Sequence, residues 1–173
     1  GAQADVVVAI TTAPDAGGNN TLTVCDQGAA TDLFTALNGT PDAGGTWSGP
    51  SAITGGMYDP AVMNPGAYVY TVAGAAPCTN ASATVQVNET GSPDAGGNGA
   101  ATLCNDGAAV NLFTALTGTP DAGGTWSGGL VGGLFDPQVN AAGTYTYTVN
   151  ATAPCVGAQA DVVVAITTAP DAG

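Results

Sequence analysis

The chain has 173 residues, with 13 acidic side chains and no lysine, arginine or histidine, so its formal net charge is −13 at pH 7. Because no cation is present to neutralise phosphate, electrostatic binding of nucleic acid and docking on an anionic membrane surface are excluded. Every apolar run falls short of the ~20 residues of a membrane-spanning helix, so membrane insertion of this segment is also excluded.

Long internal copies organise the chain. The segment GAQADVVVAITTAPDAG occurs at 1–17 and again at 157–173, and GTPDAGGTWSG occurs at 39–49 and again at 118–128. Copies of this length at a fixed spacing are typical of tandem repeats.

These spacings set the expected domain boundaries. We predict that residues 1–13 are the last strand of a preceding repeat, and that complete repeats span 14–92 and 93–173, the second ending in the start of the next linker. The chain is then an excerpt of a longer array. A subunit whose first residues complete a neighbour's sheet by donor-strand addition is an alternative that this sequence leaves open.

Short strands are predicted along each repeat, because β-branched and aromatic residues alternate with small ones between turn signals. The segments DLFTAL and NLFTAL are compatible with one helical turn or with another strand. The predicted strands lie at 4–12, 21–25, 45–49, 56–60, 66–74, 82–90 and 143–150.

The strand density indicates an all-β fold. About six or seven short strands in ~78 residues, with turn signals every ~8–12 residues, are typical of a β-sandwich. Parallel pairing is not expected, because no segment is long enough to be a helical crossover. Pro-Asp-Ala-Gly suits a tight turn, and it occurs inside each repeat and again at each joint between repeats.

Each repeat contains two cysteines, Cys25 and Cys78 in the first and Cys104 and Cys155 in the second. Their wide spacing excludes CxxC redox and zinc motifs. We therefore expect one disulfide within each domain, Cys25–Cys78 and Cys104–Cys155, each closing a loop and contributing roughly 4 kcal/mol. Such bridges indicate an oxidising compartment, either the periplasm or the outside of the cell.

The tryptophan, Asp-Pro, Tyr-x-Tyr and cysteine landmarks occur at matching places in both repeats. As a set they resemble the tandem Ig-like (PKD-like) repeats of giant cell-surface proteins of Bacteroidota. Those proteins are adhesins and gliding or extracellular-fibre components exported by type IX secretion. The resemblance covers nearly the whole chain and departs from the family only in lacking every basic residue. It implies a tandem Ig-like β-sandwich array on the cell surface and names no ligand.

Six aromatic side chains are candidate core residues. The two tryptophans could instead be platforms on which sugars stack, but one tryptophan at a fixed place in a short strand is more often buried. The six candidates are Trp47, Tyr68, Tyr70, Trp126, Tyr145 and Tyr147.

Catalysis has few possible participants here. Without histidine, lysine or arginine there is no Ser-His-Asp or Cys-His arrangement, and only carboxylate-pair chemistry of the glycosidase type remains. Asp59 and Asp136 stand in equivalent Asp-Pro turns, where an aspartate usually bonds its own turn backbone. We therefore predict that the chain is not an enzyme.

Calcium is the one cofactor worth considering. Asp15, Asp94 and Asp171 recur at the joints, and Ca²⁺ takes carboxylate and carbonyl oxygens as ligands. No DxDxDG-type loop is present, so the alternative is a set of solvated turn carboxylates.

Two functions remain. The first is a structural repeat of an extracellular stalk, filament or giant adhesin, with neighbouring repeats or identical chains as partners. The second is a module that binds carbohydrate or another surface, multiplied for avidity. The two repeats share 20 of 25 residues over 25–49 and 104–128, loops included, which favours the structural function.

Overall fold

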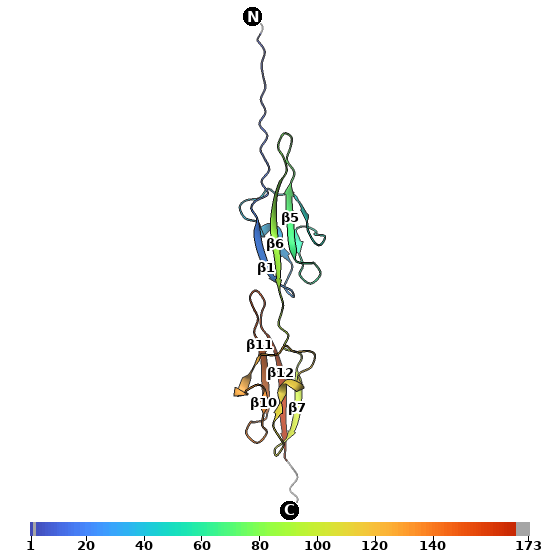
Figure 1. Cartoon of the computed structure of the whole chain (residues 1–173), viewed down its shortest axis with the longest axis vertical. Coiled ribbons are helices and arrows are strands. Elements are labelled where there is room, and N and C mark those ends of the chain that lie inside the picture. The colour runs from blue at the N-terminus through green and yellow to red at the C-terminus, as the bar shows by residue number, and fades with distance from the viewer. Residues whose placement is uncertain (2, 169–173) are drawn as a thin grey trace, which may run out of the picture. The chain divides into compact units, whose positions relative to one another are not determined.

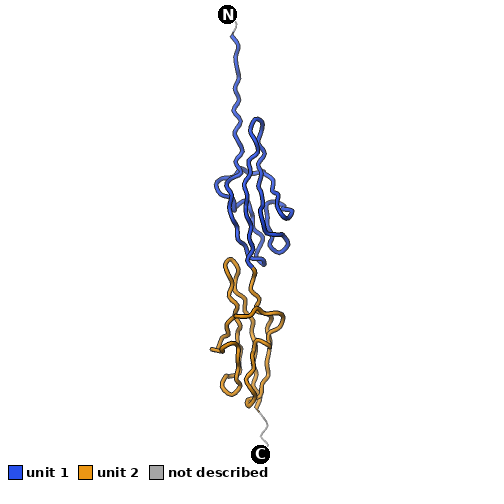
Figure 2. The backbone as a smooth tube through the Cα atoms, viewed as in Figure 1, with its two compact units in different colours: residues 1–90 blue, residues 91–173 orange. Residues whose placement is uncertain are grey.

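The computed structural model of the chain describes residue 1 and residues 3–168. The chain forms two compact units, 1–90 and 91–173, drawn in separate colours in Figure 2. Both are all-β, and the described residues contain short 3₁₀ turns but no α-helix (Figure 1). Among these residues no helix is long and apolar enough to cross a membrane.

The first unit contains a four-stranded sheet in the order β1-β6-β5-β3 and a small sheet of β2 and β4. The segment DLFTAL forms the 3₁₀ helix η1 (Leu33–Ala36), because Asp32 caps it by accepting a hydrogen bond from the Phe34 backbone N–H. The strands are β1 (Asn20–Cys25), β2 (Thr31–Asp32), β3 (Thr46–Ser48), β4 (Met57–Tyr58), β5 (Gly66–Val72) and β6 (Ala81–Thr90).

The second unit repeats this plan with the sheets β7-β12-β11-β9 and β10-β8. Asn111 takes the place of Asp32 as the cap of η2 (Leu112–Ala115). The short 3₁₀ turn η3 (Ser127–Gly129) follows the strand that contains Trp126. The strands are β7 (Gly99–Cys104), β8 (Val110–Asn111), β9 (Thr125–Trp126), β10 (Leu134–Phe135), β11 (Gly143–Val149) and β12 (Ala158–Thr167).

The first and last strands of each unit pair in parallel, contrary to the expectation of a purely antiparallel sandwich. β1 runs parallel to β6 and β7 runs parallel to β12. A parallel pair requires a long connection, and here the rest of the unit provides it, so no crossover helix is needed. This pairing fixes which ends of the strands lie together.

The core of each unit lies between its two sheets. Every second residue of β6 and of β12 points into it, including Val85 and Val87 in the first unit and Val162 and Val164 in the second. Leu33 of η1 is buried in the core of the first unit. This alternation is the period-two pattern of strands with one buried face.

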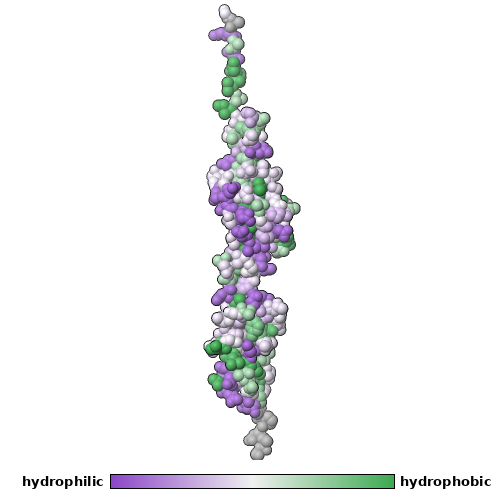
Figure 3. Space-filling model, viewed as in Figure 1, coloured by the Kyte–Doolittle hydropathy of each residue, from purple (hydrophilic) through white to green (hydrophobic). Residues whose placement is uncertain are grey.

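The predicted strand at 4–12 is not formed. The segment has no strand partner, and Val6, Val7, Val8 and Ile10 are 78 to 93% exposed. In Figure 3 it is the hydrophobic stretch near the N-terminus. The same sequence forms β12 in the second unit, where β7 and β11 flank it. A strand requires neighbours for its backbone hydrogen bonds, and the structure offers none to residues 4–12.

Candidate functional site

The two Pro-Asp-Ala-Gly turns of the first repeat form one structure. The Asp15 backbone N–H donates to Oδ2 of Asp42 at 2.9 Å, and the Asp42 N–H donates back to the Asp15 carbonyl at 2.8 Å. The Asp15 carboxylate also accepts the Gly17 N–H at 2.7 Å. The turn at the joint and the turn inside the repeat are therefore locked together, which explains why each repeat carries the motif twice.

The second repeat makes the same contacts. The Asp94 N–H donates to Oδ2 of Asp121 at 2.9 Å, the Asp121 N–H donates to the Asp94 carbonyl at 2.7 Å, and the Gly96 N–H donates to the Asp94 carboxylate. Gly96 has φ of +75° and a Cβ there would lie 2.6 Å from the Thr117 carbonyl oxygen, so the motif requires glycine at this point.

A buried tyrosine fastens each pair of turns to the main sheet. The Tyr70 hydroxyl donates to the Asp42 carbonyl at 2.7 Å and accepts the Gly45 N–H at 2.8 Å. Tyr147 makes the equivalent bonds with Asp121 and Gly124. The sequence alone indicated a core position for these tyrosines but did not reveal the role of their hydroxyl groups.

The calcium candidates at the joints are thus part of a hydrogen-bonded turn. The Asp15 and Asp94 carboxylates already accept backbone N–H groups within their own turns. Asp171 lies outside the described residues. Carboxylate and carbonyl oxygens of this kind are the ligands that Ca²⁺ takes, so a calcium site at the joints stays a prediction.

The six candidate core aromatics fall into two groups. The four tyrosines at 68, 70, 145 and 147 are buried. Trp47 and Trp126 are only half-buried and pack on the tyrosine rings, with ring centroids 5.0 Å apart for Trp47 and Tyr70 and 5.1 Å apart for Trp126 and Tyr147. Each tryptophan therefore has one side on the core and one side toward solvent.

An open groove runs beside each tryptophan. In the first unit it has a volume of about 560 Å³ and is lined by Trp47, Phe34, Tyr70, Asp32 and the glycines of neighbouring turns. The second unit has a smaller groove of about 220 Å³ at the equivalent place. These grooves are the surfaces that the sugar-stacking alternative would use.

The aspartates of the two Asp-Pro turns bond their own turn backbone, as predicted. Oδ1 of Asp59 accepts the Ala61 N–H at 3.0 Å, and Oδ1 of Asp136 accepts the Gln138 N–H at 2.9 Å. These bonds explain the aspartates by turn structure alone.

The predicted pairing of the cysteines is wrong. Cys25 and Cys155 are disulfide-bonded, whereas Cys78 and Cys104 are free thiols. Each expected bridge, Cys25–Cys78 and Cys104–Cys155, has one of these free thiols as a member, so neither bridge forms.

The parallel strand pair explains why. Cys25 is the last residue of β1 and lies opposite Thr90, the last residue of β6, whereas Cys78 precedes the first residue of β6. The two cysteines therefore lie at opposite ends of a strand of 10 residues. At about 3.3 Å per residue they are roughly 30 Å apart, far beyond the ~7 Å limit between the Cα atoms of a disulfide.

The second repeat has the same geometry. Cys104 lies opposite Thr167 at the end of β12, and Cys155 precedes the start of β12. We call the end at which the chain enters a repeat its upstream end, and the end at which the chain leaves it its downstream end. Cys78 and Cys155 are then upstream cysteines, and Cys25 and Cys104 are downstream cysteines.

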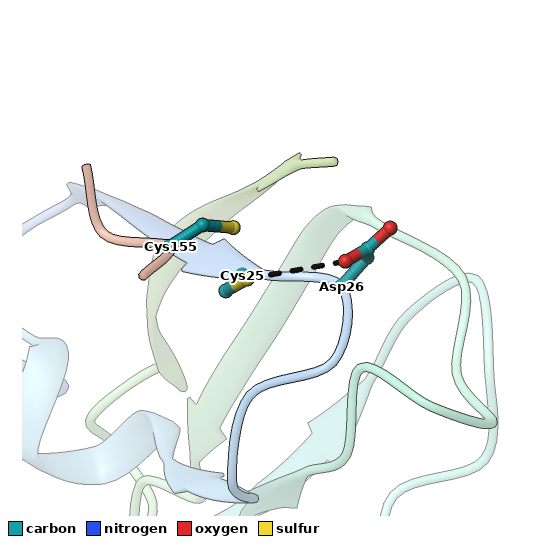
Figure 4. A group of neighbouring side chains, drawn as sticks. All are labelled: Cys25, Asp26 and Cys155. Atoms are coloured by element: carbon teal, nitrogen blue, oxygen red, sulfur yellow. Dashed lines mark hydrogen bonds between the residues drawn. The ribbon is translucent and has the colours of Figure 1, made fainter. Parts of the chain in front are cut away.

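The surroundings of the cysteines follow from these positions. The Cys78 thiol donates to the Thr11 carbonyl at 3.5 Å, and the Cys155 sulfur lies 3.9 Å from the Ser92 hydroxyl oxygen, so each upstream cysteine contacts the incoming chain. At the downstream end of the first unit, the Cys25 sulfur lies 3.9 Å from Oδ1 of Asp26 (Figure 4).

Cys104 has an electrostatic environment of its own. A hydrogen bond with the Asp106 side chain raises the pKa of the Cys104 thiol above its ordinary value. Its sulfur also donates to Oδ1 of Asn105 at 3.9 Å.

No protein-family model and no curated protein sequence matches the chain. Among solved structures, the chain is similar to two structures of titin. One is the I-band fragment I67-I69, and the other is the three-Ig structure of domains I67-I69 in an E-to-A mutated variant. Each is 12% identical, with 87% of this chain and 64% of that chain covered, and TM-scores of 0.47 and 0.46. This chain thus spans less than two thirds of those chains. The all-β, two-sheet architecture of each unit is given by its own strand order, described above.

Proposed function

We propose that the chain is a structural repeat of an extracellular stalk, filament or giant adhesin on a bacterial surface, and that it carries out no catalysis. The observation that carries this proposal is the direction of the chain through each unit. It enters beside the upstream cysteine and leaves beside the downstream cysteine, at opposite ends of the longest strand. A unit built in this way can be followed by another copy of itself without a reversal of the chain.

The paired turns support the same function. They rest on contacts between the joint residue Asp15 and Asp42 inside the repeat, so the start of each repeat is held against its body. Proline and a closed turn also leave little loose linker for a protease to bind. The lack of lysine and arginine removes every trypsin site, which suits a protein exposed outside the cell.

Two experiments on source cells test this function. Reducing denaturing electrophoresis should show a band far larger than the 16.5 kDa of this chain. Immunogold electron microscopy with an antibody to the repeat should place the label on the outer surface. Label confined to the cytoplasm would contradict the proposal.

Carbohydrate binding is the second candidate, and the grooves beside Trp47 and Trp126 are the observation that favours it. A half-exposed indole next to a carboxylate or amide, Asp32 or Asn111, offers both a stacking surface and hydrogen bonds to a sugar. Titration calorimetry with a panel of polysaccharides tests it. Saturable heats that Trp47→Ala and Trp126→Ala each reduce would support binding, whereas the absence of heat with every polysaccharide would contradict it.

A further inference from the structure

We propose that disulfides link each repeat to the next, with the downstream cysteine of every repeat bonded to the upstream cysteine of the repeat after it. Cys78 and Cys104 are then the thiols that form such disulfides with a preceding and a following repeat. This inference rests on the proposed function only in requiring that repeats follow one another. It assigns a covalent role to the two cysteines that are free thiols in this structure.

The first argument is that the two cysteines of one repeat are too far apart to form a disulfide with each other. The register places one cysteine at each end of β6 and at each end of β12, roughly 30 Å apart. A partner must therefore come from outside the repeat. The same placement relative to the strands in both repeats would be an unusual arrangement for four unrelated thiols.

The second argument is a shared neighbour. Thr11, Thr90 and Thr167 are equivalent positions of the repeated sequence. Thr90 and Thr167 are the last residues of β6 and β12, whereas Thr11 is not in a strand. Thr90 and Thr167 lie beside the downstream cysteines Cys25 and Cys104 in the strand ladders.

Thr11 lies beside an upstream cysteine, because its carbonyl oxygen accepts the Cys78 thiol at 3.5 Å. The same position of the repeat thus lies beside a downstream cysteine at Thr90 and beside an upstream cysteine at Thr11. In the proposed array, this shared position is where the downstream cysteine of one repeat and the upstream cysteine of the next come together.

The third argument is the oxidation state of the four cysteines. Cys25 and Cys155 are the downstream cysteine of one repeat and the upstream cysteine of the next, and these two are the disulfide-bonded ones. Cys78 and Cys104 are the two whose expected partners belong to repeats that this chain does not contain, and these two are thiols.

The chemistry is ordinary thiol–disulfide exchange. A thiolate of one cysteine attacks a disulfide donor such as glutathione disulfide, forming a mixed disulfide and releasing one glutathione thiolate. The second cysteine thiolate attacks the mixed disulfide at the protein sulfur and releases the second glutathione. Two cysteine thiols lose two protons and two electrons, and one glutathione disulfide is reduced.

A four-repeat array tests the proposal. Because 157–173 repeats 1–17, residues 18–173 can be appended after residue 173 without breaking the period. The product has eight cysteines, twice the four of this chain. It is refolded with glutathione disulfide, and its thiols are counted by alkylation under denaturing conditions.

The expected result is two thiols, the first Cys78 and the last Cys104, with mass spectrometry showing a peptide that joins the first Cys104 to the second Cys78. Four thiols would show that the new joint does not close, and no thiols would show bridges within repeats. Either result overturns the proposal.

A matched variant tests whether the first Cys104 is bonded to the second Cys78 in particular. Cys78→Ser in the second copy alone should release the first Cys104 as one additional thiol, without changing the far-ultraviolet circular dichroism. An unchanged thiol count would also overturn the proposal. These results do not depend on where cells place the protein, so immunogold labelling can fail while the bridges form, and the reverse can also occur.

Discussion

The segments 1–12 and 157–168 have the same sequence, yet one is a strand and the other is not. In β12, Val162 and Val164 are 0% and 2% exposed, whereas the equivalent Val6 and Val8 are 85% and 78% exposed. The difference shows that β propensity does not decide this strand. It forms where β7 and β11 supply hydrogen-bond partners and a core supplies somewhere to bury valine.

The largest expected effect comes from one substitution made in both copies. Val162→Asp places an unpaired carboxylate in the core and should cost about 4 kcal/mol or more, enough to unfold the second unit. Val6→Asp should leave the free energy of unfolding unchanged, because the side chain is already in water. Urea unfolding followed by tryptophan fluorescence measures both. Equal losses in the two variants would refute the comparison.

The same contrast explains how far the sequence could be interpreted. Alternation predicted β5 and β11, and a β-branched run predicted β6, because the residues of a half-buried strand differ between its two faces. The sequence at 4–12 is identical to that of 160–168 in β12 and the residue after it, yet the predicted strand at 4–12 is not formed. A sequence pattern carries no information on whether the partner strands are present.

The prediction of the cysteine pairing failed for a related reason. Their similar spacing in the two repeats indicated a structural role, but spacing along the chain does not reveal which ends of the strands lie together. That information lies in the parallel register of Cys25 with Thr90, a contact between the first and last strands of the unit. The paired turns of Asp15 and Asp42 were missed as well, although the doubled motif was the available signal.

A second prediction extends the comparison to β6, the last strand of the first repeat. Glu89 stands where β12 has Ile166, and its carboxylate accepts a hydrogen bond of 2.6 Å from the Tyr58 hydroxyl; the second repeat has Phe135 in place of this tyrosine. Tyr58→Phe should cost about 1–2 kcal/mol. Adding Glu89→Ile recreates the pair of the second repeat and should recover most of that loss, as urea unfolding would show. A double variant no more stable than Tyr58→Phe would contradict this account.

The same pair makes the first unit sensitive to high pH. Burial, and then the hydrogen bond to Glu89, raise the pKa of Tyr58 above its ordinary value. The folded unit therefore holds the phenol proton more tightly than the unfolded chain does. This contribution is complete below the unfolded pKa of about 10 and is lost as the pH rises above it. Unfolding at pH 8 and pH 11 should show a larger loss in the parent chain than in Tyr58→Phe, and equal losses would contradict the assignment.

The smallest expected effect concerns another matched pair. Oδ1 of Asp161 on β12 accepts the Thr146 hydroxyl of β11 at 2.7 Å. Asp161→Ala should therefore lower the free energy of unfolding by about 1 kcal/mol. Asp5→Ala changes the same residue of the unpaired copy and should have no measurable effect. Thermal melts of the two variants provide the comparison, and a matching shift in both would show that the hydrogen bond is not the cause.

Hydrogen exchange followed by mass spectrometry tests the central claim most directly. A peptide produced from within 1–12 has the same mass as its counterpart from 157–168, so one mass signal reports both copies at once. If only β12 is a strand, brief exchange should split that signal into two envelopes of equal intensity, one fully exchanged and one protected. A single envelope, either protected or exchanged, would show that the two copies have the same structure and would contradict the account.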